Sequence, residues 1–135
     1  MKMKLSNEEL HSGDIEHVER VSGEDSKKCY QCGNCSAGCP VSYAMDLPPS
    51  KMIRMLQLGK YEDVMKSTSM WVCVGCLQCY SRCPKSVSAA SFFEGLRQIV
   101  LRKGTNHDEI GDMAASFIKK APQQAIVCGF RKFVS

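Results

Sequence analysis

Apolar residues recur at helical spacing through most of the chain beyond position 50. Phe92, Leu96 and Ile99, three or four residues apart, are typical of the buried face of an amphipathic helix. Pro49 suits the first turn of an earlier helix, and Gly59 suits the residue just past its end. Spacing of this kind predicts helices over residues 50–58, 61–67, 88–103 and about 107–119.

Both ends of the chain carry a weaker pattern. Ser6 and Glu9 fit a capping box that would open a short helix near Leu10, whereas Gly13 and Gly23 keep any N-terminal helix short. The C-terminal stretch mixes apolar with basic residues, so packing on its own domain and contact with a partner are both open. We expect three parts: an N-terminal arm over 1–24, a central domain over 25–121 and a C-terminal tail over 122–135.

No run of alternating β-branched residues bounded by turn signals occurs in the sequence, which argues against a strand-rich protein. One internal repeat is plain, because the spacing C-x₂-C-x₂-C-x₃-C-P starts at Cys29 and again at Cys73. The first copy ends at Cys39 and Pro40, and the second ends at Cys83 and Pro84. The fold class predicted is all-α, with short helices around two cysteine-rich loops.

Each loop has the form that binds a [4Fe–4S] cluster. Cysteines at i, i+3 and i+6 let one tight loop reach three irons, and small residues let the backbone approach the sulfides. The fourth cysteine precedes a proline, which biases it toward extended backbone and away from its own loop. We therefore expect crossed ligation of two [4Fe–4S] clusters. The first would be held by Cys29, Cys32, Cys35 and Cys83, and the second by Cys73, Cys76, Cys79 and Cys39.

Zinc is the main alternative for such loops, because two C-x₂-C pairs commonly make one tetrahedral site. Three evenly spaced cysteines with a fourth before proline, repeated twice, favour iron–sulfur clusters over zinc. A disulfide framework is favoured less than either. The ninth cysteine, Cys128, has no cysteine near it in the sequence and is expected to be an ordinary buried thiol.

Composition and charge fit this interpretation. The N-terminus has no apolar h-region, and no run of about 18 apolar residues occurs, so neither a signal peptide nor a transmembrane segment is expected. We expect a cytoplasmic protein, since clustered cysteines in a reducing compartment indicate metal or redox chemistry rather than disulfides. Two cluster sites of about two negative charges each would cancel the formal charge of +4, so nucleic-acid binding is not expected.

The sequence holds no sign of catalysis beyond electron transfer. All eight motif cysteines are used as ligands, so neither cluster has an open iron for a substrate. No glycine-rich nucleotide fingerprint and no Ser/His/Asp or Cys/His arrangement is found. A relay of electrons between partner proteins follows. Trp71, Tyr30 and Tyr80 are expected to shield the clusters from water.

These motifs resemble those of the C subunit of heterodisulfide reductase, an α-helical ferredoxin. The resemblance covers about residues 20–103 and rests on both loops, on the segment from Lys51 to Gly59 between them, and on Trp71 before the second loop. The double motif alone is shared with other α-helical ferredoxins, including the iron–sulfur subunit of succinate dehydrogenase and fumarate reductase.

The resemblance implies a subunit of an oxidoreductase complex of methanogenesis. In that family the C subunit takes electrons from a flavin-containing A subunit, to which a hydrogenase or formate dehydrogenase can supply them. It delivers them to a B subunit that reduces the disulfide of coenzyme M and coenzyme B. The B subunit has paired cysteines, which this chain lacks, so the chain resembles the relay subunit. Two other hypotheses stay open: an iron–sulfur subunit of another dehydrogenase or quinone-linked oxidoreductase, and a zinc-binding interaction module.

Overall fold

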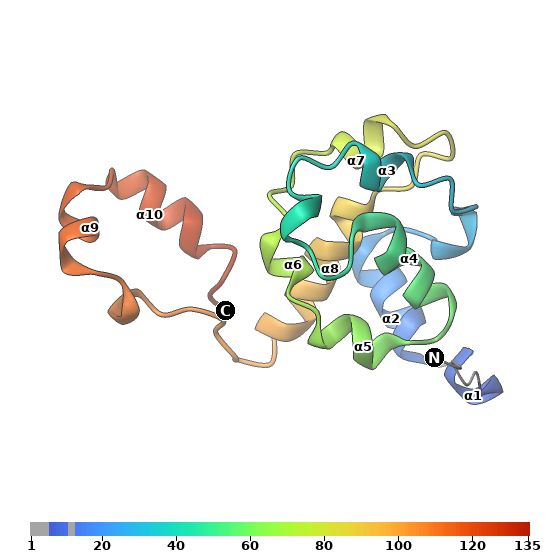
Figure 1. Cartoon of the computed structure of the whole chain (residues 1–135). Helices are drawn as coiled ribbons and strands as arrows, with labels where there is room; N and C mark the ends of the chain where they lie inside the picture. Colours follow the sequence, from blue (N-terminus) through green and yellow to red (C-terminus); the bar gives the residue numbers. More distant parts are fainter. Residues whose placement is uncertain (1–5, 11–12) are drawn as a thin grey trace. The chain divides into compact units, whose positions relative to one another are not determined.

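The computed structural model describes residues 6–10 and 13–135, and all regular structure in this part of the chain is helical (Figure 1). The all-α prediction is confirmed. The chain divides into two compact units, Met1–Leu96 and Arg97–Ser135. Each unit is described by itself below.

The first unit is built on four helices with buried apolar faces. They are α2 (Gly13–Ser22), α4 (Pro49–Gln57), α5 (Tyr61–Lys66) and α8 (Ala89–Leu101), the last of which continues past the end of the unit. Periodicity predicted the last three to within two residues at each end. The largest apolar side chains with almost no solvent exposure are Val18, Met52, Ile53, Leu56, Val64, Met70, Phe92, Phe93 and Leu96.

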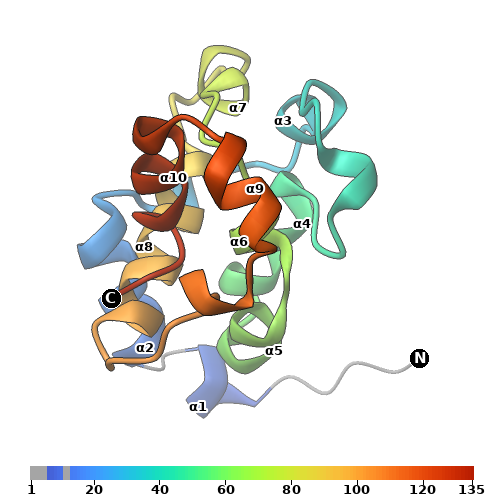
Figure 2. The ribbon, with the colours of Figure 1, turned by 90° about the vertical axis from the view of Figure 1, so that its left-hand side faces the viewer.

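The cysteine-rich loops lie at one end of this unit. Each contains a single helical turn, α3 (Asn34–Ala37) in the first loop and α7 (Gln78–Ser81) in the second. These two turns lie next to each other, opposite the end that holds α5 (Figures 1 and 2). Three short elements lead into or out of the loops: η1 (Ser26–Lys28), η2 (Ser42–Ala44) and α6 (Ser69–Val72).

Helix α2 belongs to the segment expected to be an N-terminal arm, and it packs into the core through Ile15 and Val18. Its Glu19 carboxylate accepts hydrogen bonds from the Ser26 amide at 3.0 Å and the Ser26 hydroxyl at 2.6 Å. This contact fixes the start of the first cysteine loop to the core. The predicted capping turn forms as α1 (Asn7–Leu10), but the side chain of Glu9 lies outside the described residues.

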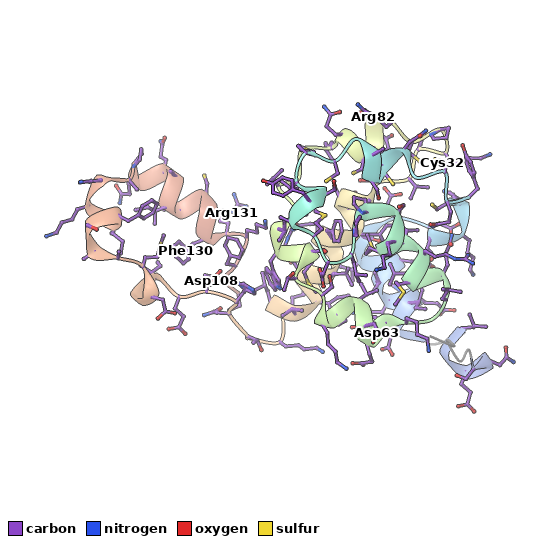
Figure 3. The ribbon with its side chains drawn as sticks, in the orientation of Figure 1. Cys32, Asp63, Arg82, Asp108, Phe130 and Arg131 are labelled. Carbon is purple, nitrogen blue, oxygen red and sulfur yellow. The ribbon has the colours of Figure 1, made fainter. Side chains whose placement is uncertain are left out.

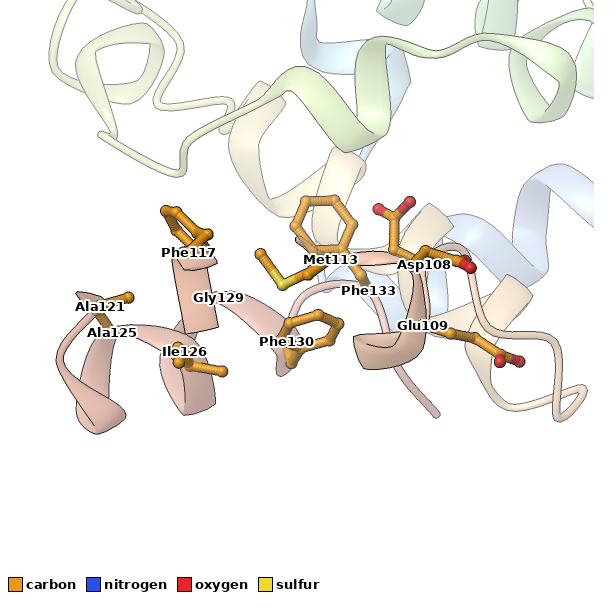
Figure 4. A pocket seen from close by; sticks show the side chains of 11 residues that line it. Asp108, Glu109, Met113, Phe117, Ala121, Ala125, Ile126, Gly129, Phe130 and Phe133 are labelled. Carbon is orange, nitrogen blue, oxygen red and sulfur yellow. The ribbon is translucent and has the colours of Figure 1, made fainter. Parts of the chain in front are cut away.

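The second unit consists of short elements that do not close a core. They are η3 (Ile110–Asp112), α9 (Ala115–Lys120) and α10 (Gln123–Phe130), and none of their side chains is buried. Their apolar residues line an open groove of about 410 Å³ (Figure 4). The lining includes Met113, Phe117, Ile126, Phe130 and Phe133, with Asp108, Glu109 and Asp112 also on its wall.

The helix predicted over residues 107–119 is wrong in its first half. The backbone is extended at Glu109, just before η3, and again at Met113, between η3 and α9, so the periodic residues do not share one continuous helix. Conversely, the tail contains helix α10, which begins directly after Pro122. Nowhere in the described chain is there a helix of the length and apolarity that crossing a membrane requires.

Candidate metal centres

The eight motif cysteines line two cavities in the first unit. The first cavity is bounded by three thiols of the first loop and one of the second: Cys29, Cys32, Cys35 and Cys83. The second is bounded by three thiols of the second loop and one of the first: Cys73, Cys76, Cys79 and Cys39. The cysteines therefore come together in the two groups that crossed ligation requires.

The repeated spacing produces a repeated backbone in the two loops. Gln31 and Gly33 have φ angles of 66° and 81°, and Gly75 and Leu77, at the equivalent positions, have angles of 66° and 61°. Two left-handed residues in each loop turn the chain sharply enough for three cysteines to face one cavity. Each loop has glycine, the residue that accepts this conformation without steric cost, at only one of these two positions.

Contact between the two short helices brings the fourth cysteine of each loop to the opposite cavity. Gly38 caps the end of α3 and Arg82 caps the end of α7, and Cys39 and Cys83 follow directly. The Arg82 side chain lies against the Gly38 backbone and occupies the space that a Cβ atom at position 38 would need. The glycine leaves the space in which the Arg82 side chain of the second loop packs against the first loop.

Amide groups donate hydrogen bonds to sulfurs of the first cavity. The side-chain amide of Gln31 donates to Cys29 Sγ at 3.3 Å, and the Val87 backbone N–H donates to Cys83 Sγ at 3.2 Å. Gln57 of α4 donates to the Cys29 carbonyl at 2.8 Å and the Ser26 carbonyl at 2.7 Å. Such donors orient thiolate ligands and stabilise their negative charge.

Asp46, which lies between the two loops in the sequence, supports the segment that leads into the second cavity. Its Oδ1 atom accepts hydrogen bonds from the Ser67 hydroxyl at 2.8 Å and the Ser69 hydroxyl and amide at 2.6 and 3.1 Å. Partial burial alone would raise the pKa of this carboxyl, but the hydrogen bonds outweigh it and lower the pKa to about 2. The carboxylate thus holds the start of α6, which leads directly to Cys73.

Desolvation affects the pKa of the third cysteine in each loop. It raises the pKa of the Cys35 and Cys79 thiols above the ordinary value. Metal ligands of this type must be deprotonated, so binding a positive metal centre here would release protons.

Aliphatic and aromatic side chains other than the expected ones cover the cavities. Tyr30 and Tyr80 are exposed, and neither they nor Trp71 line either cavity. Ile53 and Val87 line the first cavity, whereas Val41, Met45, Ala90 and Phe93 line the second. These residues come from the core helices and connecting segments. The sequence alone did not identify them as lining residues, because they are near the cysteines only in the folded chain.

The ninth cysteine, Cys128, is exposed on α10, so the expectation of a buried thiol was wrong. The side of this helix that faces the groove carries Ile126 and Phe130 instead.

A site for a single metal ion is not found among the described residues. Within residues 6–10 and 13–135, no three His, Cys, Asp or Glu side chains converge closely enough to hold one ion. The motif thiols surround cavities rather than meeting at one point.

Comparison with known families gives a consistent result. The model of a 4Fe-4S dicluster domain matches residues 25–87, which include all eight cysteines that line the cavities. This is the match expected of an iron–sulfur protein.

Curated relatives extend the similarity over most of the chain. The C2 subunit of the H(2)/formate:CoB-CoM heterodisulfide,ferredoxin reductase of Methanococcus maripaludis is 33% identical over 125 residues, which is 87% of this chain and 67% of the relative. The iron-sulfur C subunit of the CoB–CoM heterodisulfide reductase of Methanopyrus kandleri is 36% identical over 93 residues, or 66% of this chain and 48% of the relative. The second such C subunit of Methanocaldococcus jannaschii is 35% identical, over 77% of this chain and 58% of the relative. The chain thus spans about half to two thirds of the length of these relatives.

Proposed function

Because the chain belongs to the family of the iron–sulfur C subunits of heterodisulfide reductase, we propose that it is the electron-relay subunit of such a complex. It takes electrons from a flavin-containing A-type subunit and delivers them to a B-type subunit that reduces the disulfide of coenzyme M and coenzyme B, or a related disulfide. Its free-thiol cysteine set suits the reducing cytoplasm. The gathering of four thiols around each of two cavities is the observation that carries the proposal.

Two [4Fe–4S] clusters are the proposed cofactors, and they supply the one-electron exchange. Cys29, Cys32, Cys35 and Cys83 would bind the first, and Cys39, Cys73, Cys76 and Cys79 the second. Thiols that surround a cavity suit a cluster of four irons better than one zinc ion, whose four ligands all converge on a single atom. With every motif thiol used as a ligand, the chain relays electrons and leaves substrate chemistry to its partner.

Anaerobic purification with metal and sulfide analysis tests the cofactor proposal. We expect about eight irons and about eight acid-labile sulfides per chain, as two four-iron clusters require. We also expect the A-type and B-type subunits to co-purify with the chain. A folded, working protein that contains zinc and no sulfide would refute the relay function.

Serine variants test the crossed ligation. Cys32→Ser and Cys76→Ser serve as references, because each should lose a cluster that lies mainly on its own loop. We expect the paramagnetic resonance spectrum of reduced Cys39→Ser to match that of Cys76→Ser, and the spectrum of Cys83→Ser to match that of Cys32→Ser. Cys128→Ser is the control and should keep both signals. The opposite match would show that each loop supplies all four of its own ligands.

A further inference from the structure

Gln31 departs from the repeat that the two cysteine loops share. It lies between Cys29 and Cys32 and has a left-handed backbone with a φ angle of 66°, and the equivalent residue of the second loop is Gly75, with the same φ angle. A side chain in this region of backbone space meets steric resistance that glycine avoids. A residue other than glycine here points to a function for its side chain, so the contacts of Gln31 are informative.

The hydrogen bonds of Gln57 fix the orientation of the Gln31 amide group. Gln57 Nε2 donates to the backbone carbonyls of Ser26 and Cys29, at 2.7 and 2.8 Å, so Gln57 Oε1 is left to accept. Gln31 Nε2 donates to this oxygen at 3.4 Å and to Cys29 Sγ at 3.3 Å. Because an amide nitrogen has two hydrogens, both contacts form at once. The fold therefore presents a donor, and not an acceptor, to the Cys29 sulfur.

A donor at a ligand sulfur affects the two redox states of an iron–sulfur cluster unequally. Reduction by one electron adds one negative charge, which spreads over the cluster and its sulfur ligands. The Gln31 donor stabilises this additional charge, so it favours the reduced state and raises the reduction potential. Arg54 donates to Gln57 Oε1 at 3.4 Å, which places a positive charge at the outer end of the same chain of hydrogen bonds. Gly75 has no side chain, so the second loop lacks this donor at the equivalent position.

The surroundings of the two cavities act in the same direction. The four thiols of the first cavity are exposed or half-buried, and Cys32 lies near the edge of the first unit (Figure 3). Two thiols of the second cavity, Cys73 and Cys79, are buried, and the rest of its lining is apolar. A buried, apolar site stabilises an additional negative charge less well than a solvated site does. Burial therefore favours a lower reduction potential in the second cavity.

We propose that Gln31 raises the reduction potential of the cluster in the first cavity and makes it the higher-potential cluster of the two. Gln57 is the positioning residue that aims the Gln31 amide. A single electron shared between the clusters then resides on the first, which is reduced while the second is oxidised, and no bond or proton is exchanged. The inference rests on the proposed function, since it assumes that both cavities hold [4Fe–4S] clusters. It adds the order of the two potentials and a residue that sets it.

The variant Gln31→Met tests the proposed donor. Methionine keeps the length of the side chain but has no N–H group, and the residues that line the first cavity do not include Gln31. The full chain with both clusters is titrated anaerobically with redox mediators, and paramagnetic resonance follows each reduced cluster. We expect the higher midpoint potential to fall, with at least a threefold decrease in the reduced-to-oxidised ratio at the original midpoint, or about 28 mV for one electron. The lower midpoint should move by less than half as much, with iron and sulfide contents unchanged.

Two further variants separate the donor from other effects. Gln31→Gly gives the first loop the residue that the second loop has at this position, so it removes the donor while relieving the backbone, and it should lower the same midpoint. Gln78→Met makes the same chemical change at an exposed residue of the second loop and should leave both midpoints unchanged.

The outcomes distinguish this inference from the proposed function. An unchanged or higher midpoint in a Gln31 variant with full iron content would overturn the inference, and so would a fall confined to the lower-potential cluster. Either result leaves the relay function standing, because both clusters are present. A wild-type chain that assembles without clusters would instead overturn the proposed function itself.

Discussion

At the scale of single residues, Asp46 links the two cysteine loops. It lies between the last cysteine of the first loop and the first cysteine of the second, and it accepts four hydrogen bonds from Ser67, Thr68 and Ser69. The Ser69 hydroxyl in turn accepts a hydrogen bond from the Leu47 amide at 2.8 Å. This network closes the segment between the loops into a fixed turn.

Replacing Asp46 with alanine should destabilise the protein at neutral pH. The lost hydrogen bonds at the start of α6 predict a decrease of about 1–2 kcal/mol in the free energy of unfolding. For a domain of this size, that corresponds to a drop of roughly 4–10 °C in the thermal midpoint. The measurement is anaerobic thermal unfolding of both proteins at one scan rate, followed by circular dichroism. Asp46→Asn keeps one oxygen acceptor, so its thermal midpoint should lie between those of Asp46→Ala and the unmodified protein.

The pH dependence of this effect has a definite sign. Folding lowers the pKa of the Asp46 carboxyl to about 2, so its stabilisation is fully present above the ordinary aspartate pKa of about 3.9 and is lost as pH falls toward 2. Between pH 6 and 8 the difference between Asp46→Ala and the unmodified chain should therefore stay constant. A difference that changes across this range would mean that another group carries the effect.

The residues of the candidate site differ in how far sequence could predict them. The eight cysteines stand out because their spacing is local and repeated, and their ligation stays a prediction that the two four-thiol cavities support. Asp46 and Gln57 could not be predicted as supports, since their bonding partners lie more than 20 residues away. The strained Leu77 was also hidden, because the repeat puts glycine at a different position in each loop.

At the scale of elements, the close crossing of α8 over the end of α2 depends on Gly95. A Cβ atom at Gly95 would lie 3.0 Å from Ser22 Cβ, 3.2 Å from Ser22 N and 3.3 Å from Ser22 Cα. Two of these atoms belong to the backbone, so the end of α2 would have to shift by a few tenths of an ångström to admit the Cβ atom. The missing side chain thus sets the distance between two core helices.

Gly95→Ala should therefore destabilise the first unit although alanine favours helix formation. Overpacking costs about 1–3 kcal/mol, whereas the helix propensity of alanine returns up to about 1 kcal/mol, so we expect a net loss of about 1–2 kcal/mol. Gly13→Ala, at the start of α2, is the control, because no atom lies within 4 Å of the added Cβ. Urea unfolding under anaerobic conditions compares the two. A more stable Gly95→Ala protein would show that the helices can separate without cost.

Helix prediction succeeded where an element packs on a core and failed where it does not. The helices over 50–58 and 88–103 were predicted correctly because α4 buries one face in the core and α8 is buried over most of its surface. Met113 and Phe117 have the same spacing, yet they line an open groove from two separate segments. Apolar periodicity predicts that side chains lie on the same side of a segment, but it does not distinguish one continuous helix from two short ones.

At the scale of the whole molecule, the two units differ in the support that their helices receive. The 4Fe-4S dicluster match ends at residue 87, inside the first unit, where the fully buried side chains lie. In the second unit, η3, α9 and α10 bury none of their side chains. Local opening is easiest where few apolar contacts must be broken, so the second unit should open far more often than the first.

Limited trypsin digestion of the cluster-loaded chain should therefore cut first in the second unit. Lys119 and Lys120 end α9, and Arg131 follows α10, so these are the expected early sites. Lys27 and Lys85 are also exposed, but they border segments tied to the core and to the cysteine loops, so they should be cut later. Timed mass spectrometry with cluster absorbance should reveal a shortened chain that retains its iron. Early cleavage at Lys27 or Lys85 with loss of absorbance would contradict this order, because it would require the cysteine loops to open before the groove.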